Sequence, residues 1–293
     1  MTNRRQSKVT RTTRSFLARL WQMRRVLLLI IPYLILFGWL FSGGSRMDVR
    51  PGEIYAVPGN PAWESPDKEH WFGTTGNGAD LFELSRLAMA SSVSVAVVSV
   101  SLGIGLALLV TMLFVFDGGK KRFEMLNAAS RAGFLMPSMA VLVIFTGGSG
   151  GSLVMAISGL IFVIAFHLCP VLTAWFDEGE GGFDVLASYA LGLTRREIVM
   201  NRILPKVLRR LIGVFAVLVP VVVLVEMALS FMGLTGDRLS CGAMIAYGQV
   251  LIIEAPWMAI YPGILASLVV MVLSLLGWRV SAALRTGNIP GIF

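Results

Sequence analysis

The stretch LAMASSVSVAVVSVSLGIGLALLVTMLFVF, residues 87–116, decides the fold class of this 293-residue chain. It carries no charged side chain, and it is longer than the roughly 20 apolar residues that a helix needs to cross the hydrocarbon core of a bilayer. We therefore predict a transmembrane helix that is tilted, or whose first turns lie in the interface before Gly103 and Gly105.

Other apolar segments of the chain predict further helices of this kind. They are residues 26–41, about 128–146, 153–176, 211–231 and about 258–278. The 128–146 segment is the least typical because it contains Arg131 and Pro137. Together with 87–116, these segments predict an all-α, polytopic membrane protein with six transmembrane helices.

The composition of the whole chain supports the same class. Hydrophobic residues make up 56% and charged residues 14%, whereas soluble proteins average about 25% charged. This excludes a soluble enzyme, a free DNA-binding protein and intrinsic disorder. The two cysteines, Cys169 and Cys241, form no disulfide framework, and the sequence has no HExxH, CxxC or phosphate-loop motif. We therefore expect no metal site, and if ATP is used, another chain hydrolyses it.

The basic residues give the orientation. If six helices cross the membrane, 19 of the 25 lysine and arginine residues lie on one side of it and five on the other, and Arg131 lies inside a span. Since positive loops stay in the cytoplasm, both termini are predicted to be cytoplasmic. Residues 1–25 then form a basic cytoplasmic segment, 26–41 a retained anchor (favoured over a cleaved signal peptide), 42–86 an extracytoplasmic loop and 286–293 a tail. The net charge of +8 is a topology signal, not a nucleic-acid signature.

The largest cytoplasmic feature is the loop 177–210. Residues 183–192 predict a short helix ended by Gly192, the usual C-terminal residue. Residues 194–197, TRRE, have capping-box spacing and predict a second helix that runs to Pro205. The apolar face of the first helix consists of Val185, Leu186, Tyr189 and Leu191. It can bind a partner protein or belong to an ordinary interfacial linker, and the residues alone leave both open.

Several motifs resemble those of ABC-importer permeases. They are AxxALG at 187–192 followed by ILP at 203–205, HWFGT at 70–74 with Gly78, Asp80, Ser85 and Arg86, EMALSFMGL at 226–234, APW at 255–257, YPG at 261–263 and LG at 276–277. In order and spacing, residues 65–285 resemble the C-type subunit of the dipeptide/oligopeptide/nickel family. The first motif resembles the family's EAA loop.

The chain departs from the family pattern at several positions. Leu186 stands where the EAA motif has glutamate, and Ser188 stands at its second alanine. Thr75, Ala79 and Cys241 replace an aspartate, an arginine and a tryptophan. The chain resembles a divergent member, so the fold transfers better than the substrate.

The resemblance implies a type I importer fold, with residues 87–285 as the transmembrane domain of a non-catalytic subunit in the bacterial inner membrane. The implied partners are a second homologous permease, two ATPase subunits or domains that hold ATP and Mg, and an extracytoplasmic substrate-binding protein. The chain itself would be surrounded by lipid and would bind no cofactor. The cargo would be peptides or a related small solute. The residues implied in ATPase coupling are Leu186, Ala187, Ser188, Leu191, Gly192, Arg195 and Arg196.

Glu226, Ser230 and His167 are polar side chains within predicted spans. Charge at this depth is costly, so these groups should face protein or a water-filled cavity. They either line a translocation path or serve helix packing. Two other functions stay open: a stand-alone channel or secondary transporter, and a membrane scaffold without transport. The sequence shows no internal repeat that would favour a secondary transporter.

Overall fold

The computed structural model describes residues 31–42, 61–116, 128, 137–148 and 150–285. The segment 1–25, Arg131 and the tail 286–293 lie outside the described residues. In the part that is described, the regular elements are helices, and the backbone makes one isolated β-bridge, between Thr74 and Asp80. This confirms the all-α prediction for that part.

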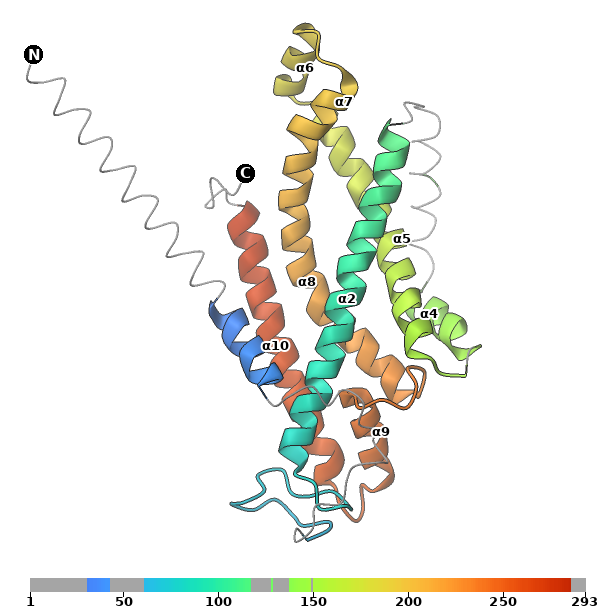
Figure 1. The fold of residues 1–293 in the computed structure, drawn as a ribbon, viewed down its shortest axis with the longest axis vertical. Helices are drawn as coiled ribbons and strands as arrows, with labels where there is room; N and C mark the ends of the chain where they lie inside the picture. Colours follow the sequence, from blue (N-terminus) through green and yellow to red (C-terminus); the bar gives the residue numbers. More distant parts are fainter. Residues whose placement is uncertain (1–30, 43–60, 117–127, 129–136, 149, 286–293) are drawn as a thin grey trace, which may run out of the picture.

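Among the described residues, four helices are long and apolar enough to cross a membrane. Figure 1 shows them running along the long axis of the molecule: α2 (Leu81–Phe116), α5 (Leu153–Glu180), α8 (Leu204–Phe231) and α10 (Trp257–Arg285). The described parts of the other two predicted spans are shorter apolar helices, Ile31–Phe41 and α4 (Ser138–Gly147). A count of six spans and the side of the termini stay predictions.

The helix α2 begins at Leu81, six residues before the predicted start. The carboxylate of Asp80 explains this boundary, because Oδ1 accepts hydrogen bonds from the backbone N–H groups of Phe82 (2.8 Å) and Glu83 (3.1 Å). Such a side chain satisfies donors that the first helical turn leaves unpaired. The predicted outer loop 42–86 is therefore too long by its last six residues.

Close backbone contact joins α8 and α10. A Cβ atom on Gly277 would lie 2.2 Å from the carbonyl oxygen of Ala216, so only glycine allows this approach. The helix α2 packs against both α5 and α8, and α8 in turn packs against α10. The largest fully buried side chains include Met89, Leu142, Leu160, Phe176, Leu229 and Leu273.

The predicted end of a helix at Pro205 is wrong. α7 (Arg195–Ile198), the π-helix η1 (Val199–Ile203) and α8 follow one another without a break. The N–H of Leu204 bonds to the carbonyl of Val199, five residues back. Pro205 follows directly, as one of the first residues of α8, so the wider π-helical turn lies just before the residue that cannot donate an N–H. The helix α5 also extends beyond the predicted residue 176, to Glu180.

Two groups of short elements mark opposite ends of the bundle (Figure 1). The helices α6 (Phe183–Ala190) and α7 lie at one end, while the segment 61–80 and α9 (Cys241–Val250) lie at the other. The helix α9 was not predicted. Its start has a recognisable signal, Ser240, whose Oγ accepts from the N–H of Ala243 at 3.2 Å.

Candidate functional site

The helix α6 is fixed to the bundle by its inner face. Val185 is fully buried, and Ser188 is buried with its hydroxyl donating to the carbonyl of Asp184 at 2.7 Å. The ammonium of Lys206 on α8 lies 2.7 Å from Oδ2 of Asp184. This hydrogen bond lowers the pKa of Asp184 below its usual value. The carboxylate therefore stays ionised, and α6 is held by packing and by an ion pair.

The turn after α6 is a Schellman motif. Gly192 has a φ of +83°, and its N–H bonds to the carbonyl of Tyr189 at 3.0 Å. The N–H of Leu193 bonds to the carbonyl of Ser188 at 3.2 Å. These two bonds close the C-terminus of a helix and place a left-handed residue between them. The predicted helix end at Gly192 is confirmed.

The capping box at the start of α7 is also confirmed. The N–H of Thr194 donates to Oε2 of Glu197 at 2.9 Å, and the N–H of Glu197 donates to Oγ1 of Thr194 at 3.4 Å. A helix end and a helix start therefore lie two residues apart, at Gly192 and Thr194. This short connection holds α6 and α7 in a defined relation at the tip of the molecule.

The outer face of α6 and its turn carries large exposed apolar side chains. Phe183 is 90% exposed and Leu191 82%, with Leu186 at 56% and Tyr189 at 42%. Ala187 is exposed as well. The predicted face needs one correction, because Val185 points inward and is not available to a partner. Clustered apolar surface of this kind is typical of a protein interaction site. We call Phe183, Leu186, Tyr189 and Leu191 the apolar knob.

The other predicted coupling residues differ in their exposure and in their contacts with the bundle. Gly192 is exposed, and a Cβ atom there would meet no heavy atom within 4 Å. Ser188 is only 3% exposed, so it supports α6 from beneath. Arg195 forms an ion pair with Glu180 at 2.8 Å. The guanidinium of Arg196 lies 5.7 Å from the ring centroid of Phe116. Both arginines thus brace the tip against α5 and α2.

A second cluster surrounds Glu226 at the opposite end of α8. Glu226 is completely buried and forms an ion pair with Arg238. Ser230 donates to Oε1 of Glu226 at 2.6 Å and lies 2.8 Å from the hydroxyl of Thr235. Arg238 also donates to Oγ of Ser91 on α2 at 2.5 Å. Buried charges are usually paired in this manner, so the contacts favour helix packing for Glu226 and Ser230.

Sequence reasoning missed Arg238. It entered only as one basic residue of an outer loop, although it is the single basic residue between α8 and α10. A single basic residue twelve positions after a glutamate within an apolar span was the sequence signal that could have predicted this ion pair.

His167 belongs to another part of the bundle. Its Nδ1 lies 2.8 Å from the carbonyl of Val163, and its Nε2 lies 3.4 Å from Oγ of Ser138 on α4. These contacts join α5 to α4 and favour packing for His167 too.

The motifs at 70–74 and 261–263 come together at the end that carries α9. Nδ1 of His70 lies 3.0 Å from Oδ2 of Asp80, and this hydrogen bond raises the pKa of His70. The ring of Phe72 stacks on Tyr261 with 4.9 Å between centroids. Arg86 is buried and donates to the carbonyl of Trp39 at 2.8 Å, at the end of the helix Ile31–Phe41. Segments far apart in the sequence thus share one compact cap.

Metal ligands do not gather anywhere in the described part of the chain, where no three His, Cys, Asp or Glu side chains could hold an ion together.

Known proteins similar to this chain are oligopeptide permeases. No protein-family model matches the chain. The oligopeptide transport system permease protein OppC of Mycobacterium tuberculosis (strain H37Rv) is 25% identical over 221 residues, which cover 73% of this chain and 74% of the relative. OppC of Bacillus subtilis (strain 168) is 22% identical over 247 residues (80% and 76%). OppC of Haemophilus influenzae is 25% identical over 212 residues (71% and 67%).

Proposed function

We propose that this chain, a divergent member of the dipeptide/oligopeptide/nickel family of ABC-importer permeases, forms part of an import path for oligopeptides or a related small solute. A second homologous permease would complete the path. The chain is a multi-pass membrane protein, and we place it in the bacterial inner membrane.

The apolar knob is the observation that carries this proposal. Its side chains are exposed at the tip of the bundle, while the buried side chains of Val185 and Ser188 pack the other face of α6 against the bundle. A helix with an unpaired apolar face fits a groove on an ATPase subunit. Leu186 stands at the glutamate position of the EAA motif that this loop resembles, so the coupling would depend on apolar packing. ATP and Mg would be bound by the ATPase partners.

The opposite end of the molecule suits the delivery of substrate. The segment 61–80 folds onto α2 and α10 through the ring contacts of Phe72 with Phe82 and with Tyr261. This compact end would receive an extracytoplasmic binding protein that carries the peptide. The separation of the two ends along the bundle matches an importer that is loaded on one side and driven from the other (Figure 1).

The buried charges favour this function over a secondary transporter. Such a transporter uses intramembrane charges to bind ions or protons. Here Glu226 is already paired with Arg238 and accepts a hydrogen bond from Ser230. A scaffold without transport has no specific observation in its favour.

Purification of the tagged chain from its native membrane tests the proposal. We expect a second permease and ATPase chains in the eluate. After reconstitution into liposomes, with the substrate-binding protein supplied on the side of the segment 61–80, we expect ATP-dependent uptake of a labelled oligopeptide. A control with a non-hydrolysable ATP analogue should show no uptake. Uptake driven by an ion gradient, with no ATPase chain present, would refute the importer assignment.

A further inference from the structure

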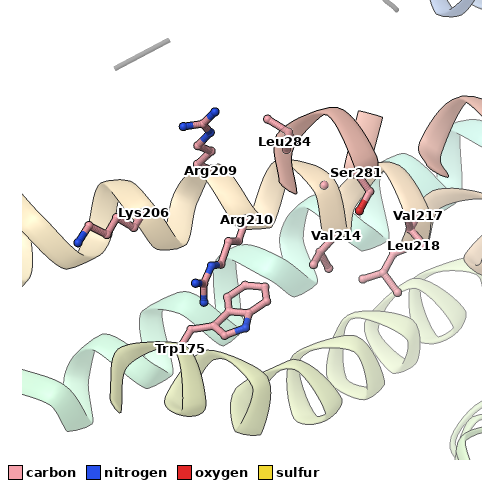
Figure 2. Close-up of a pocket in the computed structure, with 10 residues that line it drawn as sticks. Trp175, Lys206, Arg209, Arg210, Val214, Val217, Leu218, Ser281 and Leu284 are labelled. Atoms are coloured by element: carbon pink, nitrogen blue, oxygen red, sulfur yellow. The ribbon is translucent and has the colours of Figure 1, made fainter. Parts of the chain in front are cut away.

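A groove of about 800 Å³ lies where α8 faces α10 and the end of α5. Figure 2 shows Arg210 directed toward Trp175, with Val214 and Leu218 further along α8 and Leu284 on the other wall. Lys206, Arg209 and Arg210 form its basic rim, and Val214, Val217 and Leu218 form its apolar floor. The two parts have different chemistry, so the groove suits a ligand with a charged head and an apolar body.

The sequence of α8 produces this division. Lys206, Arg210, Val214 and Leu218 follow one another at intervals of four residues, so they lie along one face of the helix. That face changes from charged to apolar between Arg210 and Val214. In a membrane protein this change marks the border between lipid headgroups and hydrocarbon.

Trp175 marks the same level from α5. The guanidinium of Arg210 lies 5.6 Å from the ring centroid of Trp175. Tryptophan is enriched at the membrane interface because its ring is apolar and its N–H polar. Two helices thus place interfacial side chains at the mouth of the groove.

Three basic side chains border the groove. Arg210 pairs with Glu178 at 2.6 Å, and Lys206 pairs with Asp184 at 2.7 Å. Both pairs are exposed to solvent, where an ion pair contributes little and an arriving anion can compete. The side chains that line the groove itself include three basic ones and no acidic one. A phosphate group is the complementary ligand.

We propose that this groove binds an anionic phospholipid of the cytoplasmic leaflet. The phosphate would lie among Lys206, Arg209 and Arg210, and one acyl chain would pack along Val214, Val217 and Leu218. Basic pockets between membrane helices on this side attract anionic headgroups. The proposal does not depend on the importer function, since it needs only a membrane-embedded chain with α6 and α7 on the cytoplasmic side.

Lipid retention by the purified full-length chain tests this site. The chain is washed in detergent, exchanged into nanodiscs that contain phosphatidylglycerol or phosphatidylcholine, and analysed for bound lipid by native mass spectrometry. We expect preferential retention of phosphatidylglycerol. Arg209→Gln and Arg210→Gln should each weaken it about fivefold, the factor for one basic residue near a membrane surface. Arg279→Gln, an exposed arginine of α10 that does not line the groove, is the matched control.

A second pair of variants tests the apolar floor without changing charge. Val217→Trp should fill the groove and reduce retention, while Leu224→Trp, on an exposed part of α8 outside the groove, should not. Equal retention of the two lipids, or equal effects of Arg210→Gln and Arg279→Gln, would overturn the proposal. So would a Val217→Cys chain that crosslinks to a second membrane protein in the native complex, because protein would then fill the groove.

Discussion

If an ATPase docks at the apolar knob, as proposed, Leu191→Ser should weaken its binding without unfolding the chain. Complete burial of a leucine side chain stabilises by about 1.5 to 3 kcal/mol. Leu191 is 82% exposed, so most of this gain is still available to a docking partner. Leu191→Ser therefore removes about 2 kcal/mol of binding free energy, which is about a 30-fold increase in the dissociation constant.

Phe183 offers the same measurement at a second position. It is 90% exposed, and Phe183→Ser should give a loss of similar size, about 2 kcal/mol. The double variant should bind about a thousandfold more weakly if the two contributions add. Since both side chains are exposed, the melting temperature should stay close to that of the wild type.

The assay titrates the co-purified ATPase subunits onto the chain in nanodiscs and compares dissociation constants. Ile253→Ser is the matched control, because Ile253 is 94% exposed but lies between α9 and α10, at the other end of the bundle. The control should bind like the wild type. Unchanged affinity for Leu191→Ser and Phe183→Ser, or an equal loss in the control, would refute ATPase docking at the apolar knob.

Three further perturbations test other contacts. Gly192→Val forces a β-branched residue to a φ of +83°, which costs about 1 to 3 kcal/mol. We expect the variant to insert into the membrane normally but to hydrolyse ATP without importing peptide. Full peptide uptake by this variant would count against a coupling role of the turn at Gly192. Glu226→Gln or Arg238→Gln alone should lower the free energy of unfolding by about 3 to 5 kcal/mol, because each leaves a buried charge without its partner. Replacing both residues by apolar ones should lower it by less. A double variant whose loss of stability equals the sum of the two single losses would contradict this. The pairing of His70 with Asp80 raises the pKa of His70, so it stabilises the fold fully below the ordinary histidine pKa of about 6.5. This stabilisation is lost as the pH rises through the raised pKa. Asp80→Asn should therefore make the melting temperature depend less on pH, and an unchanged pH profile would show that this pair does not cause the pH dependence.

Much of the fold follows from local sequence patterns. The long apolar runs locate α2, α5, α8 and α10, because a membrane-spanning helix needs little beyond length and apolarity. The ends of the short elements at the tip follow from Gly192 and from Thr194 with Glu197, since helix caps depend on residues only a few positions apart. These are the features that one sequence can specify.

Contacts between distant residues were not predictable in the same way. The pairing of Glu226 with Arg238 depends on how the connection after α8 folds back, and the neighbouring sequence does not encode that path. The inward position of Val185 depends on how α6 is rotated against α5 and α7. The missed continuation through Pro205 has a local cause, because the rule that proline ends a helix does not foresee a π-turn before it.

A continuous run of helix from Arg195 to Phe231 connects the two ends of the molecule. At 1.5 Å per residue, its 37 residues span about 55 Å. One end begins directly after the apolar knob, and the other contains Glu226. The π-helical turn Val199–Ile203 lies close to the tip, and Pro220 lies further along the helix. Both are positions at which a helix can bend, so a displacement of the tip would reach the far end of this helix through two defined hinge points.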